Sequence, residues 1–194
     1  GATKLASDKL FVAANSYSGD SGTIFSVVRY GNVMGSRGSV IPFFQSLPDN
    51  QPTPVTDIRM TRFMISLESG VSLSLKALED SIGGEIYVKK IPSMNIVEIA
   101  KAIRPNNEII EVGIRPGEKL HEQMIGIEDA PFTYEYDEHY KILPNIYDAS
   151  LDPLRIKDGH AVPDNFSYTS DNNKEWMTID ELTLWLKNNP SALK

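Results

Sequence analysis

The residues of this chain best suited to chemistry lie in a glycine-rich loop that follows a β-branched segment. Residues 27–30 read Val-Val-Arg-Tyr, and residues 31–38 then supply three glycines, one asparagine and one arginine. Because glycine has no Cβ, such a loop lets backbone N–H groups approach a phosphate closely. The asparagine and arginine side chains add directional hydrogen-bond donors. We therefore expect residues 31–38 to bind a nucleotide at the carboxyl end of a parallel strand, where open α/β sheets bind ligands.

Apolar patterns predict the strands and helices that position this loop. Residues 24–30 form a near-continuous apolar run, typical of a strand buried on both faces. A helix is predicted after Ser66, its expected N-cap, and two glycines at 83–84 stop it. Its apolar stripe consists of Leu67, Val71, Leu75, Leu78 and Ile82. The other predicted elements are helices at 2–15, 93–103 and 119–125, a short helix or turn at 40–47, and strands at 54–57, 85–88 and 108–112. This alternation predicts an α/β fold.

The pattern of apolar and polar residues changes after about residue 127. Residues 134–147 suggest short irregular strands, and residues 150–175 are polar and rich in turn formers. A final helix is predicted near the end of the chain, because Thr178 and Glu181 form a capping box and Met177 and Leu182 a hydrophobic staple. We therefore divide the chain into residues 1–126 and 127–194.

Composition excludes several classes of function. The 194 residues, of which 41% are hydrophobic, suffice for a buried core. A net charge of −7 argues against a general nucleic-acid binder, and no apolar run approaches the roughly 18 residues of a membrane span. With no cysteine and three scattered histidines, we expect no metal site. The absence of cysteine also fits a cytoplasmic protein.

The chain opens Gly-Ala-Thr-Lys, without a methionine, inside or at the edge of a predicted helix. We expect it to be part of a longer protein, because the start signals of a helix are missing; the alternative is a helix that simply begins the protein. Residues 24–30 would then normally pair with strands outside this sequence. Without them they present an apolar edge, so we predict that the isolated chain is oligomeric or poorly soluble.

Several motifs resemble one enzyme family. Lys4 on a helix, followed by a strand that ends Arg-Tyr-Gly-Asn-Val, resembles the extended short-chain dehydrogenase/reductase superfamily. In that superfamily a tyrosine lies four positions before the lysine, which places it just ahead of Gly1. Five segments resemble a single family within this superfamily: residues 4–11 (KLASDKLF), 28–44, 55–63, 115–122 (RPGEKLHE) and 166–176. These segments are similar to the UDP-N-acetylglucosamine 4,6-dehydratases of polysaccharide and flagellin-sugar biosynthesis, most of all to the inverting branch that starts pseudaminic acid synthesis.

The resemblance implies the C-terminal part of an extended short-chain dehydrogenase/reductase Rossmann fold with a small α/β substrate-binding lobe. Residues 1–126 would form the C-terminal part of the NADP-binding domain, interleaved with that lobe, and residues 127–194 would extend the lobe. The resemblance further implies NADP as a recycled hydride carrier, a UDP-sugar as substrate, no nucleic-acid or membrane partner, and a homo-oligomer in the full-length protein.

Cofactor contacts are implied for Lys4 and for the glycine-rich loop. Lys4 would hydrogen-bond the nicotinamide ribose and lower the pKa of the family's tyrosine, because an adjacent cation favours phenolate. The alternative is a solvated helix lysine. The loop would meet the nicotinamide half or the pyrophosphate of NADP, and the alternative is a plain glycine turn with a surface arginine. Its residues are Val33, Met34, Gly35, Ser36 and Arg37.

Substrate contacts are implied for five further residues. Asn32 and the backbone of Val40 would contact the sugar nucleotide, and Thr56 would lie near the base. Arg115 would face the diphosphate, whose oxygens suit its planar fork, and Glu118 would accept hydrogen bonds from the uridine ribose. The alternatives are an Asx turn at Asn32, core packing at Val40, an ordinary strand position at Thr56, and a weak surface ion pair between Arg115 and Glu118.

Two other charged residues carry weaker expectations, since Arg62 is a further candidate for the nucleotide and Asp57 is expected to be solvated. In the family's chemistry, hydride leaves sugar C4, water is eliminated across C5–C6, and hydride returns to C6. This sequence lacks the G-x-G-x-x-G motif, the tyrosine and an Asp-Lys pair, so we expect residues 1–194 alone to be inactive. Competing interpretations are a non-catalytic UDP-sugar-binding or complementing module, a generic α/β domain, a retaining dehydratase and a UDP-sugar epimerase.

Overall fold

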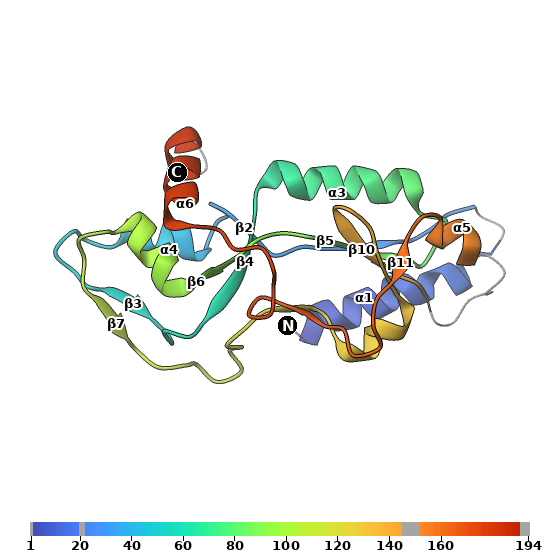
Figure 1. Cartoon of the computed structure of the whole chain (residues 1–194), viewed down its shortest axis with the longest axis horizontal. Helices are drawn as coiled ribbons and strands as arrows, with labels where there is room; N and C mark the ends of the chain where they lie inside the picture. Colours follow the sequence, from blue (N-terminus) through green and yellow to red (C-terminus); the bar gives the residue numbers. More distant parts are fainter. Residues whose placement is uncertain (1, 20–21, 145–151, 191–194) are drawn as a thin grey trace. The chain divides into compact units, whose positions relative to one another are not determined.

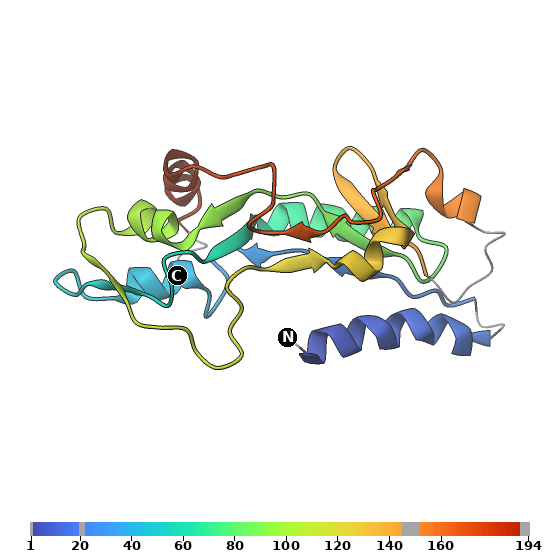
Figure 2. The same cartoon turned by 60° about the horizontal axis from the view of Figure 1, so that its bottom comes forward.

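The computed structural model describes residues 2–19, 22–144 and 152–190 (Figures 1 and 2). The chain divides into two compact units, each assembled from three separate stretches of sequence. Unit 1 comprises Gly1–Tyr30, Glu68–Lys90 and Met124–Ser167. Unit 2 comprises Gly31–Leu67, Ile91–Gln123 and Tyr168–Lys194. The division of the chain at residues 126 and 127 stays a prediction.

Unit 1 is built on a mixed sheet with a helix on each side. The order of its strands is β1 (Val27–Arg29), β5 (Ile86–Lys89), β10 (His139–Ile142), β9 (Thr133–Glu135) and β11 (His160–Ala161). β1 and β5 are parallel, and the other pairs are antiparallel. Figure 1 shows α3 (Leu67–Asp80) on one side of the sheet and α1 (Ala2–Ala14) on the other. Shorter elements are η1 (Asn15–Tyr17), β8 (Gln123–Ile125), η3 (Ile127–Phe132) and α5 (Asp152–Ile156).

The apolar stripe that predicted α3 is not the face that the helix buries. All five stripe residues are between 38% and 76% exposed. The helix instead buries Gly70, Leu73 and Ala77, and the last two pack with Tyr87 of β5. Two of these three residues are small, and a Cβ on Gly70 would be in ordinary contact with the Tyr30 ring, at 3.9 Å. Periodicity located the helix correctly but did not reveal its inner face.

The strand predicted at residues 24–30 is shorter and less buried than expected. β1 covers Val27–Arg29, and its residues are half-buried rather than enclosed on both faces. In the described part of the chain β1 is the outermost strand of its sheet and pairs with β5 alone. An edge strand has one unpaired side, which accounts for the partial exposure.

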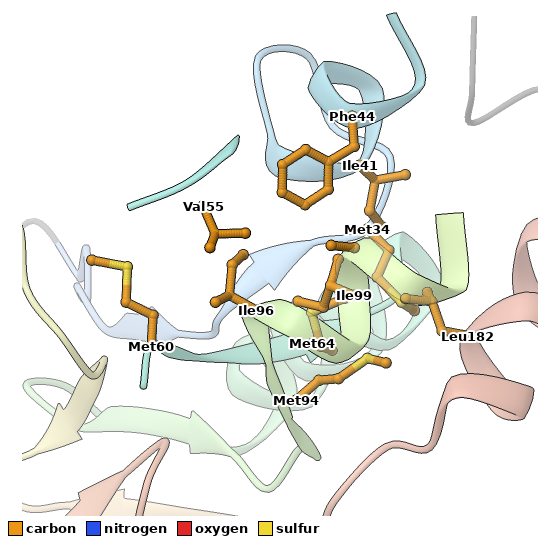
Figure 3. Packing of buried hydrophobic residues seen from close by; sticks show 11 residues of the cluster. Met34, Ile41, Phe44, Val55, Met60, Met64, Met94, Ile96, Ile99 and Leu182 are labelled. Carbon is orange, nitrogen blue, oxygen red and sulfur yellow. The ribbon is translucent and has the colours of Figure 1, made fainter. Parts of the chain in front are cut away.

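Unit 2 encloses a core between two small sheets and three helices (Figure 3). The core residues are Met34, Ile41, Phe44, Val55, Met60, Met64, Met94, Ile96, Ile99, Ala100 and Leu182. One sheet has the order β2 (Asn32–Val33), β4 (Thr61–Ile65) and β6 (Ser93–Asn95), and the other pairs β3 (Thr53–Val55) with β7 (Ile109–Glu111). The remaining elements are α2 (Val40–Ser46), α4 (Ile96–Ile103), β12 (Tyr168–Thr169) and α6 (Ile179–Asn188).

Two predicted helices of unit 2 differ from the structure. Ser93 does not cap a helix but lies in β6, where its backbone bonds to Glu175 and Met177. α4 begins three residues later, and the Asn95 side chain accepts from the Val97 N–H at 2.8 Å. Residues 119–125 form bends and then β8 instead of a helix. By contrast, the capping box of Thr178 and Glu181 at the start of α6 is confirmed.

Candidate functional site

The glycine-rich loop leaves β2, which runs parallel to β4. Asn32 pairs with Met64 and Val33 with Ile65 in this ladder. Gly31 precedes β2 at a point of close contact, because a Cβ there would lie 2.4 Å from Phe63 Cβ and 2.9 Å from its carbonyl oxygen. Real Cβ atoms do not approach so closely, so the glycine is required for β2 to lie against β4.

Two consecutive turns then lead from β2 into α2. The Ser36 N–H donates to Val33 O at 3.1 Å, and the Ser39 N–H donates to Ser36 O at 3.0 Å. Gly35 and Gly38 take φ values of +74° and +73°, which glycine adopts without strain. The exposed members of the loop are Asn32, Ser36, Arg37 and Gly38, whereas Met34 is buried in the core. The loop therefore has an anchored inner side and a free outer side that carries the donors.

The start of α2 holds a buried polar atom that the sequence did not point to. Ser39 precedes α2, and its Oγ is buried without a hydrogen-bond partner among the described residues. Its side chain does not cap the helix. Val40, the first residue of α2, packs its side chain against the core, as the alternative interpretation of that residue expected. A contact between its backbone and a ligand stays a prediction.

Thr56 and Glu118 meet although they are 62 positions apart in sequence. The Thr56 hydroxyl lies 3.4 Å from Glu118 Oε1 and 2.9 Å from the sulfur of Met60. A separation of 3.4 Å is at the long limit of a hydrogen bond, so the Glu118 carboxylate keeps acceptor capacity for other donors. Both side chains are half-buried, which leaves them in reach of a ligand.

Arg62 holds the loop that carries Glu118. Its guanidinium, whose side chain is 14% exposed, donates to the carbonyl oxygens of Thr61 at 2.8 Å and Leu120 at 3.1 Å. It also lies 3.9 Å from Glu118 Oε1 and 3.6 Å from Glu122 Oε1. Arg62, the weaker candidate for binding the nucleotide, thus holds residues 118–122 against the start of β4. The spacing of residues in the sequence could not reveal this positioning role.

Arg115 and Glu118 contact each other in a way that the sequence did not predict. The Arg115 backbone N–H, not its guanidinium, donates to Glu118 Oε2 at 3.2 Å. The Glu118 N–H closes a turn onto the Arg115 carbonyl at 3.0 Å, and Gly117 takes a φ of +79° within it. In the described ranges the exposed Arg115 guanidinium forms no ion pair, so the alternative of an Arg115–Glu118 ion pair is not seen.

A polar triangle formed by the buried Thr61 and Ser170 and the partly exposed His121 ties three motif segments together. Thr61 Oγ1 lies 2.8 Å from His121 Nδ1 and 2.6 Å from Ser170 Oγ. The Ser170 hydroxyl also accepts from the Glu122 N–H at 2.9 Å. These contacts bring together Thr61 at the start of β4, residues 121–122 and Ser170. All of them lie in unit 2, although they are far apart in sequence.

The expectation that Asp57 is solvated is wrong. Asp57 is 4% exposed and forms an ion pair with Arg59 at 2.6 Å. Hydrogen bonds from the Arg59 side chain and backbone lower the pKa of Asp57 to about 2. This carboxylate closes the turn between β3 and β4 that carries Thr56.

Lys4 lies in unit 1, on α1, with an exposed side chain. The other predicted contact residues, from Asn32 to Glu118, lie in unit 2. The roles predicted for Lys4 and for the loop residues stay predictions. Within the described ranges, no helix has the length and hydropathy to cross a bilayer, and no three His, Asp or Glu side chains are grouped to hold a metal ion.

Fold and site together define an α/β chain with a glycine-rich loop on a parallel strand pair. The structure matches Pen from Bacillus thuringiensis with a TM-score of 0.82 and 32% identity, over 100% of this chain and 57% of that one. This likeness confirms the predicted class, part of an extended short-chain dehydrogenase/reductase fold. A sequence model described as "Polysaccharide biosynthesis protein" matches residues 1–144, and the chain belongs to that family.

The chain is similar in sequence to two curated proteins whose names include a UDP-sugar. The chain is 53% identical over 190 residues to a UDP-N-acetylglucosamine 4,6-dehydratase (inverting) of Campylobacter jejuni, covering 94% of this chain. It is 33% identical over 193 residues to a UDP-glucose 4-epimerase of Rickettsia bellii, covering 97% of this chain. The chain spans 57% and 56% of the lengths of these two relatives. The resemblance found in the motifs is confirmed by this similarity.

Proposed function

We propose that the protein carrying this chain is a nucleotide-sugar 4,6-dehydratase that acts on UDP-N-acetylglucosamine and inverts C5. The observation that carries the proposal is the convergence of Thr56, Arg62 and Glu118 beside the Arg115 loop in unit 2. The 53% identity to a protein named for this reaction supports it. A place in pseudaminic acid and flagellin-sugar synthesis, in the cytoplasm, is part of the same proposal.

The donors and acceptors of unit 2 suit a UDP-sugar. The exposed Arg115 guanidinium presents a planar fork to diphosphate oxygens. Glu118 carries two oxygens whose protein contacts, at 3.2 Å and 3.4 Å, are long enough for ribose hydroxyls to compete for them. The Thr56 hydroxyl and the exposed Asn32 amide add a donor and acceptor each.

The loop at residues 33–37 and Lys4 are proposed to hold NADP. The orphaned Ser39 hydroxyl and the unobstructed turn at Gly38, where a Cβ would meet nothing within 4 Å, fit a polar ligand against this loop. Bound NADP would supply a hydride acceptor for sugar C4 and a hydride donor for C6. Arg37 would neutralise phosphate charge, and the Lys4 ammonium would donate to the nicotinamide ribose.

A homo-oligomer of the full-length protein is also proposed. Apolar side chains on α1 and α3 of unit 1 are exposed, including Leu5 and Leu10 of α1 at 58% and 70%. Exposed apolar surface of this kind marks association sites. Four exposed stripe residues on α3 and Ile82, which follows the helix, add to it.

The reaction is tested by incubating the complete protein with UDP-N-acetylglucosamine and NADP and recording proton NMR spectra. We expect a 4-keto-6-deoxy sugar with a new C6 methyl signal and inverted C5. Arg115→Ala is expected to slow turnover, and the matched surface variant Lys101→Ala to leave it unchanged. Residues 1–194 alone are expected to give no product, and detectable dehydration by them would contradict that expectation.

A second candidate, UDP-sugar 4-epimerase, is favoured by the 33% identity to the Rickettsia protein. The same spectra separate the two activities, because an epimerase changes only the configuration at C4 and forms no methyl group. Retention of configuration at C5 with a new methyl group would indicate a retaining dehydratase. Binding of the UDP-sugar without any product, by the complete protein, would indicate a non-catalytic or complementing module.

A further inference from the structure

One arginine of unit 1 joins three segments that are far apart in sequence. Arg29 lies at the end of β1, and its side chain is 15% exposed. The Arg29 guanidinium donates from Nε to Asp8 Oδ2 of α1 at 2.7 Å. From Nη1 it donates to the Met124 carbonyl oxygen at 2.8 Å and to Asp129 Oδ2 at 3.1 Å. All three partners belong to unit 1, so Arg29 holds α1 from a place that β1 and residues 124–129 fix.

The carboxyl end of α1 has anchors of its own. Asn15 follows the helix directly and exchanges two hydrogen bonds with the backbone of Phe25. Its amide donates to the Phe25 carbonyl oxygen at 2.9 Å, and its Oδ1 accepts from the Phe25 N–H at 2.9 Å. Val12 is buried, at 8% exposure, and the centroid of the Phe11 ring lies 6.3 Å from that of Phe25. These contacts hold the last turn of α1 against the residues that lead to β1.

The first half of α1 lacks such packing. The side chains at positions 3–6 are all exposed, and Val12 is the only buried one among the described side chains of the helix. Val12 follows Lys4 by eight positions, a distance of roughly 12 Å along a helix axis. Asp8 lies midway between them, with a side chain that is 20% exposed. The ion pair of Asp8 with Arg29 therefore holds the half of the helix that apolar burial does not hold.

Lys4 and Asp8 are neighbours on the surface of α1. They are four positions apart, a spacing at which helical side chains lie one turn apart on the same face. Within the described ranges no ion pair is found for Lys4, whereas Asp8 is paired with Arg29. Because the arginine neutralises this carboxylate, the attraction of Asp8 for the Lys4 ammonium is weaker. Arg29 thus holds the helix and leaves the Lys4 ammonium available for a ligand.

We propose that Arg29 is a positioning residue for Lys4 and acts through Asp8. This role rests on the proposed function, in which the Lys4 ammonium donates to the nicotinamide ribose of NADP. The Met124 carbonyl oxygen and the Asp129 carboxylate fix the guanidinium, so it sets one place for Asp8 and for the helical turn that carries Lys4. A misplacement of about 1 Å is enough to weaken a contact of this kind.

The anchoring is tested by hydrogen exchange in the complete protein without added NADP. Asp8→Ala removes the carboxylate from α1 and keeps the other two bonds of Arg29. The matched control, Asp129→Ala, removes the second carboxylate from the same guanidinium, at a similar exposure of 15%, and leaves α1 unaltered. We expect Asp8→Ala to speed exchange of the amides at residues 6–10 about tenfold or more, and Asp129→Ala less than about threefold. Alanine is the better helix former, so faster exchange there reports the lost anchor.

The consequence for Lys4 is tested by calorimetric titration of NADP into the same proteins. We expect Asp8→Ala to weaken NADP binding about fivefold, and Asp129→Ala less than about twofold, since only the first displaces one charge-assisted hydrogen bond. Arg29→Gln, which frees the Asp8 carboxylate to attract Lys4, is expected to weaken binding at least as much as Asp8→Ala. The pH of half-maximal kcat/KM for dehydration is expected to rise by about 0.5 in Asp8→Ala, because a misplaced cation favours phenolate less.

Two results would overturn the positioning role. One is equal exchange at residues 6–10 in Asp8→Ala and Asp129→Ala, and the other is NADP binding by Asp8→Ala that equals that of the unaltered protein. Failure of the proposed function is a separate outcome, because it is an absence of dehydration by the unaltered complete protein. In that event the exchange rates and the NADP titrations still decide the role of Arg29.

Discussion

Replacement of Thr61 by valine is expected to weaken unit 2 without changing the shape of its core. Valine matches threonine in volume, but it removes the hydroxyl at the centre of the triangle with His121 and Ser170. Thr61 is 5% exposed and Ser170 is 0% exposed, so water cannot easily replace the lost partner of Ser170. The Ser170 hydroxyl keeps its bonds to the Thr61 carbonyl oxygen at 3.2 Å and to the Glu122 N–H at 2.9 Å, so the substitution removes side-chain hydrogen bonds, each worth about 1 kcal/mol, without leaving Ser170 unpaired. We therefore expect Thr61→Val to lower the free energy of unfolding by about 1 kcal/mol.

Urea unfolding followed by tryptophan fluorescence reports on the stability of unit 2, where the substitution lies. The two tryptophans of the chain, Trp176 and Trp185, both lie in unit 2. Thr169→Val is the matched control, because that hydroxyl bonds to Asp171 at an exposed position and its loss is expected to change stability by less than about 0.5 kcal/mol. Equal effects of the two substitutions, or no effect of Thr61→Val, would refute the role given to the triangle.

Three further predictions follow from burial and contact distances. His139 takes up a proton near pH 6.5 when unfolded but only near pH 4 when folded, so stability is full above pH 6.5 and falls by at most about 3 kcal/mol toward pH 4; urea titrations against pH should show a flatter profile for His139→Phe. Leu73→Ala is expected to cost about 2–5 kcal/mol and Leu75→Ala less than about 0.5, because they are 3% and 56% exposed; similar unfolding midpoints for both would mean that α3 buries a different face. Gly31→Ala is expected to cost about 1–3 kcal/mol, because its Cβ would overlap Phe63; a thermal midpoint equal to that of the unaltered protein would show that β2 is not held there.

Local sequence patterns predicted an element correctly where all the interactions that fix it lie within a few residues of each other. The capping box at Thr178 fixed the start of α6 because all of its atoms lie within one helical turn. Ser93 has the same kind of side chain, yet its backbone is held extended by Glu175 and Met177 from a distant segment. No local pattern contains that pairing, so the predicted N-cap of α4, Ser93, lies two residues before the observed N-cap, Asn95.

The inner face of α3 shows a second limit of prediction from sequence. Its stripe of large apolar residues is the stronger periodic signal, but the sheet accepts the face carrying Gly70, Leu73 and Ala77. The buried face packs Leu73 and Ala77 against Tyr87 of β5, a contact between distant segments that no pattern within the helix contains.

The candidate site was predictable in its residue types more than in its contacts. The Arg115–Glu118 turn could be foreseen from its proline and glycine, since these four residues are consecutive. Arg62 could not be identified as the anchor of that turn, because its partners at 118–122 lie more than fifty positions away. Asp57 was misjudged for a related reason: its burial depends on how β3 and β4 meet.

The central claim, that unit 2 binds a UDP-sugar through the Arg115 loop, is tested most directly by calorimetric titration of UDP into the protein and into two variants. The account predicts saturable binding that Arg115→Ala weakens about tenfold or more, since a charge-assisted contact to phosphate is worth about 1.5–3 kcal/mol. Lys101→Ala, the matched loss of an exposed cation in the same unit, should bind UDP like the unaltered protein. Equal affinity of the Arg115→Ala and Lys101→Ala variants, or no UDP binding by any of the three proteins, would contradict it.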